Sequence, residues 1–74
     1  MYFVYSLQSE SVQDRYYIGI TENIERRLIE HNRGDSVFTS KYKPWKLVFY
    51  VAFENKEKGI KFENYLKTGS GRNF

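Results

Sequence analysis

The most constraining feature of the sequence is the segment 16–31, which reads YYIGITENIERRLIEH. Its first five residues are aromatic, β-branched or glycine, and this composition favours a short strand. Ile24 and Leu28 follow one helical turn apart, as in an amphipathic helix. Thr21 stands where an N-cap residue is expected. We therefore predict a strand that runs directly into a helix from residue 22 to residue 32 or 33.

This predicted helix carries two polar side chains on the side that its apolar residues mark. Arg27 and His31 are spaced i, i+4, so both project to that side. An amphipathic helix normally keeps long polar side chains off its buried face. We interpret the helix as presenting an Arg and the single His of the chain to the element on which it packs.

Two further strands are expected. Residues 2–7 alternate weakly and are rich in aromatic and β-branched residues, which predicts a strand. The polar residues 8–15 then form a loop that closes a hairpin with residues 16–20. Residues 46–53 are largely apolar on both faces, which predicts a strand covered on both sides.

A second helix is expected near the C-terminal end of the chain. Asn55 is suited to cap a helix over about residues 56–67. Gly59 inside it costs about 1 kcal/mol relative to Ala, and close packing against another element would explain that cost. Gly34 is suited to end the first helix in a left-handed conformation. Residues 35–44 are interpreted as a polar connection.

The order of elements is therefore β-β-α-β-α. This order predicts an α+β fold with a three-stranded, mostly antiparallel sheet flanked by helices, in a single domain over residues 1–74. The chain has no cysteine, so disulfides and Cys-based zinc sites are excluded, and aromatic residues, 19% of the chain, must supply the core.

Composition also bounds the surroundings of the protein. No apolar run is long enough to span a membrane and no signal-peptide pattern is present, so we expect a cytoplasmic protein without membrane contact. The net charge of +3 permits a nucleic-acid partner without establishing one. A monomer is the default for a small basic domain.

The segment 17–19, Tyr-Ile-Gly, followed by Thr21, Arg27 and His31, resembles the second half of the GIY-YIG nuclease motif. Residues 3–5, Phe-Val-Tyr, resemble its first half, with Phe and Val where the motif has Gly and Ile. The resemblance covers nearly the whole chain. It is closest to the small standalone bacterial members, which are similar to the nuclease domain of an excision-repair incision subunit.

The resemblance implies that Tyr5 and Tyr17 are catalytic, with hydroxyls that converge on one face of the hairpin. From the residues alone, the favoured interpretation is that both are core or edge aromatics, among seven tyrosines. A phenol has a pKa near 10, so it needs a nearby cation or metal to act as a base.

Arg27 and His31 match the positions where the family has an Arg and, one turn on, a His or Tyr. An Arg can hold a phosphate oxygen and stabilise charge that develops in phosphoryl transfer, and a His can move a proton near neutral pH. The alternative is structural, with Arg27 lying along the sheet edge and pairing with an acidic residue such as Glu63.

Glu63 lies in the segment 61–72, which is close to the second-helix signature of the small standalone members. The resemblance makes Glu63 the expected ligand of Mg²⁺ or Mn²⁺. One carboxylate is sufficient, because Mg²⁺ completes its shell with water and phosphate oxygens. Without the resemblance, Glu63 is an exposed glutamate on a charged helix.

Cationic and hydroxyl side chains elsewhere are candidate phosphate contacts, which give affinity rather than base reading. The nucleic-acid contacts expected first are Thr21, Arg26, Lys41, Lys67 and Arg72, with Thr39 and Lys43 as further candidates. Asn73 is a weak match to a polar residue late in the family motif. Trp45 either stacks on a base or anchors the third strand.

The resulting hypothesis is a metal-dependent endonuclease that hydrolyses DNA phosphodiester bonds with a single divalent cation and no small-molecule cofactor. It would select branched or damaged DNA structures, or sequence only weakly, as a DNA-repair enzyme does. The alternative is a non-catalytic module that binds nucleic acid or protein on the same fold.

Overall fold

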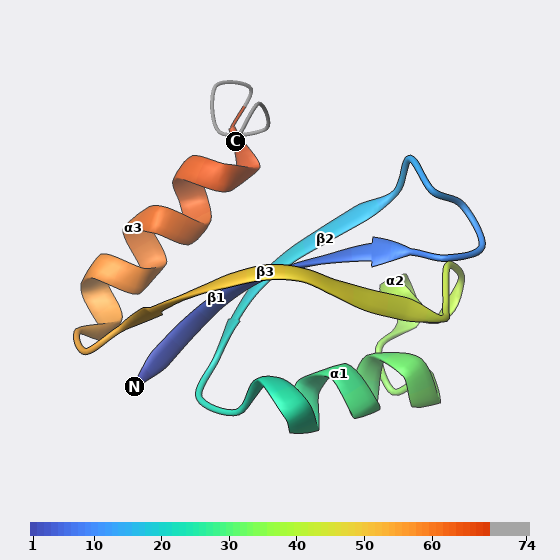
Figure 1. Cartoon of the computed structure of the whole chain (residues 1–74), viewed down its shortest axis with the longest axis horizontal. Helices are drawn as coiled ribbons and strands as arrows, with labels where there is room; N and C mark the ends of the chain where they lie inside the picture. The colour runs from blue at the N-terminus through green and yellow to red at the C-terminus, as the bar shows by residue number, and fades with distance from the viewer. Residues whose placement is uncertain (69–74) are drawn as a thin grey trace.

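The fold is built on a three-stranded antiparallel sheet whose central strand is the first in the chain (Figure 1). The computed structural model describes residues 1–68. Its elements are β1 (Tyr2–Ser9), β2 (Tyr16–Thr21), α1 (Ile24–Arg33), α2 (Val37–Ser40), β3 (Trp45–Phe53) and α3 (Lys56–Lys67). The sheet order β2-β1-β3 confirms the predicted α+β class and the antiparallel hairpin.

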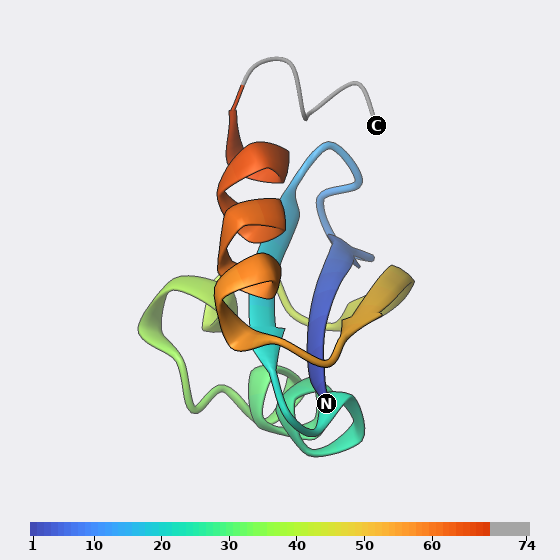
Figure 2. The same ribbon diagram turned by 90° about the vertical axis from the view of Figure 1, so that its left-hand side faces the viewer.

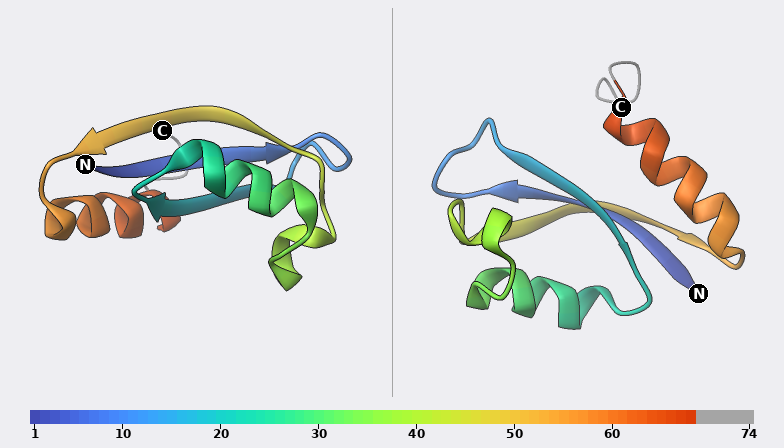
Figure 3. Two further views of the ribbon diagram at one scale, coloured as in Figure 1. Left: turned by 90° about the horizontal axis from the view of Figure 1, so that it is seen from below. Right: turned by 180° about the vertical axis from the view of Figure 1, so that it is seen from behind.

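The sheet separates two layers of helices (Figures 2 and 3). On one face, α1 and α2 enclose a core of Tyr5, Leu7 and Trp45. On the opposite face, α3 packs against β1 and β2, with Gly59 beside Ile20. No helix among residues 1–68 combines the length and apolar character needed to cross a membrane.

The start of α1 differs from the prediction. Its N-cap is Asn23, not Thr21, and the Asn23 side chain accepts a hydrogen bond from the backbone N–H of Arg26 at 3.0 Å. The Thr21 hydroxyl instead accepts a hydrogen bond from the backbone N–H of Asn23 at 3.1 Å. Both residue types cap helices well, and Thr21 is held in β2 by pairing with Phe3. Gly34 ends α1 with φ 90°, as predicted.

The connection over residues 35–44 contains the helix α2, which the prediction missed. α2 has four residues, too few to show a helical hydrophobic period. The backbone N–H of Ser40 closes the turn by donating to the carbonyl of Ser36 at 2.9 Å. α2 lies against the end of α1, so it is positioned by tertiary contact rather than by its own sequence pattern.

β3 is not covered on both faces, and that prediction was wrong. Val48 is 48% exposed and Tyr50 is 53% exposed. The register of β1 with β3 shifts between Ser6 and Leu7, so Val48 is an extra residue opposite this point. Trp45 belongs to the core and Leu47 packs against it, whereas Tyr50 lies in a surface cleft beside Ile24 and Leu28 that α1 leaves open.

Two glycines mark close approaches of different kinds. A Cβ at Gly19 would lie 2.5 Å from the hydroxyl oxygen and 2.7 Å from Cζ of Tyr5, its direct partner on β1. A Cβ at Gly59 would lie 2.9 Å from Cδ1 of Ile20. The predicted close packing at Gly59 is confirmed, but its neighbour is the free end of a flexible side chain, whereas the Tyr5 ring is buried.

This contrast gives a matched pair of substitutions. We expect Gly19→Ala to lower the free energy of unfolding by about 1–3 kcal/mol, because the Tyr5 ring must leave its position. Gly59→Ala should stay within about 1 kcal/mol of the wild type, since the gain in helix propensity offsets a small shift of Ile20. Urea unfolding monitored by circular dichroism measures both, and equal losses in the two variants would contradict this account.

Candidate active site

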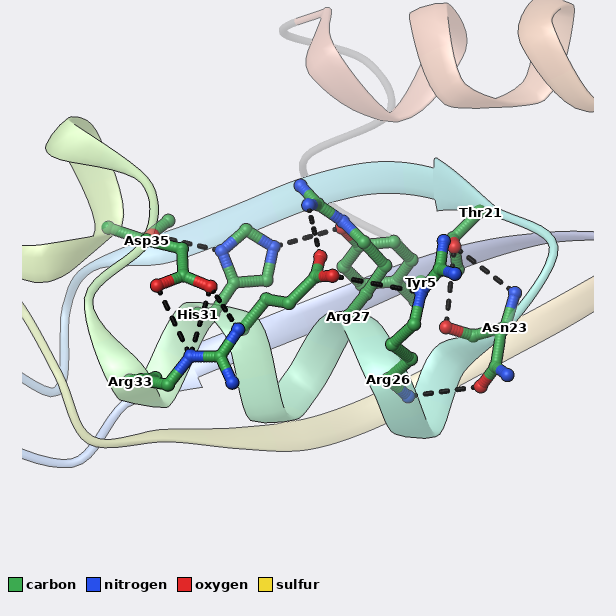
Figure 4. Close-up of polar contacts among 10 residues, drawn as sticks. Tyr5, Thr21, Asn23, Arg26, Arg27, His31, Arg33 and Asp35 are labelled. Atoms are coloured by element: carbon green, nitrogen blue, oxygen red, sulfur yellow. Dashed lines mark hydrogen bonds and ion pairs between the residues drawn. The ribbon is translucent and has the colours of Figure 1, made fainter.

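His31 is the centre of the polar cluster on the α1 side of the sheet (Figure 4). It is fully buried and lies in the last turn of α1. Its Nε2 lies 3.1 Å from the hydroxyl oxygen of Tyr5, and its Nδ1 lies 2.9 Å from the hydroxyl oxygen of Thr39. Both ring nitrogens therefore have hydroxyl partners, one contributed by β1 and the other by α2.

Burial lowers the pKa of His31 below its ordinary value of 6.5, and the positive charge of Arg27 lowers it further. The Glu30 carboxylate opposes this shift. His31 is consequently neutral at pH 7, with one nitrogen that donates and one that accepts. A neutral imidazole of this kind retains the capacity to take up one proton.

Arg27 lies between a carboxylate and a phenol. Its Nη1 donates to Oε1 of Glu30 at 2.7 Å. The guanidinium also lies beside the Tyr5 hydroxyl, and contact with Glu30, followed by Tyr5, raises the pKa of Arg27. Its side chain is 33% exposed, so the group is positioned by the protein and still reachable from solvent. This arrangement suits the binding of a phosphate oxygen.

The two tyrosines have different environments. Tyr5 is 2% exposed, and burial raises its pKa above 10, with Arg27 opposing the shift and the charges of Tyr17 and Glu63 adding to it. Tyr17 is half-buried, and its ring centroid lies 4.8 Å from that of His31. The hydroxyl hydrogen-bonded to His31 is that of Tyr5, whereas Tyr17 contacts His31 through its ring.

Glu63 lies on α3, on the other face of the sheet from α1. Its side chain is 15% exposed, and its Oε2 lies 3.2 Å from Nζ of Lys67. Its charge contributes to the raised pKa of Tyr5, so the carboxylate acts on the same space as Arg27. Within residues 1–68, no three His, Cys, Asp or Glu side chains gather into a possible metal site. Glu63 is thus a single carboxylate donor beside the cluster.

The structural alternative for Arg27 was an ion pair with an acidic residue such as Glu63. Arg27 is ion-paired, but with Glu30 from its own helix rather than with Glu63. The sequence analysis did not identify Glu30 as the partner of Arg27. The i, i+3 spacing of Arg27 and Glu30 was the available signal, because residues three apart on a helix are neighbours.

The candidate phosphate contacts are dispersed. Arg26 is exposed and lies 3.7 Å from Glu30, Lys41 is exposed, and Lys67 pairs with Glu63. Thr21 is half-buried and engaged with Asn23. The remaining candidates from the C-terminal segment, Arg72 and Asn73, lie outside the described residues.

Two residues proposed to touch nucleic acid are buried instead. Thr39 is fully buried and bonded to His31, so its prediction as a phosphate contact was wrong. Trp45 is 3% exposed, and its Nε1 donates to the Thr39 carbonyl at 2.8 Å. Of the two interpretations of Trp45, the anchor of the third strand is the one that holds.

Known proteins are similar to this chain over most of its length. The model of the GIY-YIG catalytic domain family matches residues 1–73. A structure-specific endonuclease subunit SLX1 homolog of Drosophila mojavensis is 44% identical over 71 residues, which cover 84% of this chain and 23% of the relative. The SLX1 homolog of Giardia intestinalis is 41% identical over 69 residues, covering 85% of this chain and 19% of the relative.

A bacterial relative has a more similar length. A UPF0213 protein of Clostridium perfringens is 37% identical over 68 residues, covering 90% of this chain and 71% of the relative. The chain thus spans most of this relative but less than a quarter of each SLX1 homolog named above. Together with the match of the family model to residues 1–73, these relatives show that the chain belongs to the GIY-YIG catalytic domain family.

Proposed function

We propose that this chain is a metal-dependent endonuclease that hydrolyses phosphodiester bonds of DNA, with selectivity for branched or damaged structures. The observation that carries the proposal is the convergence of Tyr5, Arg27 and His31 in one polar cluster, with the charge of Glu63 acting on it. Membership of the family and the SLX1 relatives, which are named subunits of a structure-specific endonuclease, support the same activity.

Arg27 binds the phosphate in this proposal. Its guanidinium is held from one side by Glu30 and faces the Tyr5 hydroxyl on the other, so its orientation is set before the substrate arrives. A positioned cation stabilises the charge that develops on the phosphoryl oxygens more than the charge of the ground state. Tyr5 and Glu30 are therefore positioning residues for Arg27.

The attacking water loses its proton to the tyrosines and His31. Water attacks the phosphorus in line, and the bond from phosphorus to the leaving oxygen breaks. Tyr17 is the half-exposed tyrosine, and it takes a proton from the water as it passes its own hydroxyl proton to Tyr5. Tyr5 in turn passes its hydroxyl proton to Nε2 of His31, and the leaving oxygen takes a proton from solvent. This route needs no free phenolate, which burial disfavours at Tyr5. It does need His31 to be neutral.

Glu63 would hold the divalent cation, which we propose to be Mg²⁺ or Mn²⁺. A lone carboxylate suits Mg²⁺, which keeps several waters and takes substrate phosphate oxygens as ligands, and it does not suit a cation that requires a cage of protein ligands. When bound, the cation supplies charge stabilisation at the leaving oxygen. Lys67 must release Glu63, which its half-exposed side chain allows.

The first test concerns Glu63. We expect Glu63→Gln to reduce Mg²⁺-dependent cleavage of a branched DNA by at least about 100-fold, because the amide is a much weaker ligand for a hard cation. Glu57→Gln is the matched control, since Glu57 lies on the same helix, makes an analogous i, i+4 ion pair and is 79% exposed. Gel-based cleavage with urea unfolding as a folding check gives the answer. Full activity in Glu63→Gln would overturn the assignment, and DNA binding without any cleavage would favour a non-catalytic module.

The second test concerns Arg27. Arg27→Ala should lower the cleavage rate about 100-fold or more, with a stability change near that of an exposed ion pair, about 0–1 kcal/mol. Arg26→Ala is the control, because Arg26 makes only a long contact with Glu30 and its side chain is 70% exposed. Equal loss of cleavage in both variants would mean that Arg27 acts through general charge rather than through its position.

The third test concerns the protonation of His31. Because His31 is the only histidine, a proton NMR titration resolves one imidazole, and its midpoint should fall below 6.5. A folded-state pKa below the unfolded value means that folding disfavours the imidazolium. Stability is then complete above about pH 6.5 and declines as the pH falls through the folded-state pKa. A midpoint at or above 6.5 would contradict the lowered pKa that burial and the charge of Arg27 give His31.

A further inference from the structure

Phe38 is a large apolar side chain that takes no part in the proposed reaction. It lies on α2 and is 58% exposed, although its ring packs 6.1 Å from Tyr17 and 6.1 Å from Tyr42 between centroids. The other ring in this group, Trp45, is buried beneath Tyr17 and Tyr42. The exposed ring of Phe38 therefore packs on other aromatic rings and can stack on a further ring. We call Phe38, Tyr17 and Tyr42 the stacking platform.

This platform is one wall of a cleft of about 860 Å³. The cleft extends from Phe38 on α2 past Tyr16 and Tyr17 on β2 to Lys67 at the end of α3. Tyr16, 54% exposed, is a further aromatic lining it. The cleft therefore follows β2, which forms the free edge of the sheet (Figure 2).

The charge of the cleft suits an anionic strand. Arg15 and Lys67 both line it, and the Arg15 guanidinium lies 5.3 Å from the centre of the Tyr42 ring. Asp14 is the one carboxylate among the lining residues. Aromatic faces interleaved with cations are the elements with which proteins hold single nucleic-acid strands, the bases by stacking and the phosphates by charge.

The cleft is continuous with the proposed active site through two shared residues. Tyr17 lines the cleft and has its ring beside His31, and Lys67 lines the cleft and pairs with Glu63. A nucleotide in the cleft would consequently lie beside Tyr17, to which the proposed reaction assigns the proton of the attacking water.

We propose that Phe38 and the cleft beside it bind an unpaired nucleotide of the DNA substrate, next to the phosphate that is cleaved. In a duplex, each base is already stacked on both sides, so only an unpaired or displaced base can offer its face to Phe38. The proposal rests on the proposed nuclease function for the placement of the phosphate. The stacking site itself depends only on binding, so the two are tested separately.

The experiment measures the affinity of the full chain, in EDTA, for a fluorescein-labelled single-stranded oligonucleotide and for the corresponding perfect duplex. Phe38→Ala should weaken binding of the single strand by about fivefold to a hundredfold, which is the range for one base–aromatic stack, and should leave duplex binding within about twofold. Fluorescence anisotropy measures both affinities.

Three further variants separate stacking from packing and from general hydrophobicity. Phe38→Trp should retain single-strand binding, and its exposed indole should be quenched by the single strand but not by the duplex. Phe38→Leu should bind as weakly as Phe38→Ala, because a leucine has no π face. Tyr50→Ala is the control, since Tyr50 is an aromatic of similar exposure, 53%, on β3 and outside the cleft. It should bind as the wild type does.

Several outcomes would overturn the inference. Unchanged single-strand binding in Phe38→Ala, full rescue by Phe38→Leu, or an equal loss with single strand and duplex would each exclude a stacking site. Folding of every variant is checked by urea unfolding, and if Phe38→Ala unfolds, the comparison of Phe38→Trp with Phe38→Leu decides. Phe38-dependent binding without cleavage would reject the nuclease function alone, whereas cleavage indifferent to Phe38 would reject this inference alone.

Discussion

The burial of His31 between two hydroxyl groups is the constraint on which the site depends. A buried polar group without partners would cost about 1–3 kcal/mol, so Tyr5 and Thr39 must both be in place for α1 to pack with this face inward. Thr39 is supplied by α2, whose position is secured in turn by the hydrogen bond from the Trp45 indole to its backbone. Asn32 of α1 exchanges two hydrogen bonds with the backbone of Trp45 and so ties the same helix to β3. A continuous series of hydrogen bonds thus links β1, α1, α2 and β3.

The same constraint explains why polar residues occupy the inward side of α1. A purely apolar face would pack as well, but it would lack the Arg27 guanidinium beside the Tyr5 hydroxyl and the imidazole whose Nε2 lies against that hydroxyl. Within residues 1–68, every buried side-chain nitrogen and oxygen has a hydrogen-bond partner, so the polar cluster is fully satisfied. Such networks are rigid, and rigidity is what a positioned cation such as Arg27 requires.

Local sequence patterns were sufficient to predict the strands, the two long helices and the side of α1 that faces inward. The strands and the two long helices follow from hydrophobic period, and the inward position of His31 follows from its spacing relative to Leu28. What escaped prediction depends on tertiary contact. α2 has too few residues to show a helical hydrophobic period. The exposure of Tyr50 depends on how much of the sheet α1 covers. The pairing of Arg27 with Glu30 depends on the direction that the Arg27 side chain takes. The roles of the site residues came from the family resemblance, not from these patterns.

The geometry also explains why residues from opposite faces of a sheet can act together. α1 and α3 are separated by the sheet, so their side chains can meet only around a free edge, and β2 is such an edge. Tyr5 stands on the central strand, and its ring extends across β2 because its partner there, Gly19, has no side chain. The charge of Glu63 on α3 contributes to the raised pKa of this phenol. Gly19 matters to the candidate site as much as to the strand, because any side chain at this position would displace the Tyr5 ring from its place over β2.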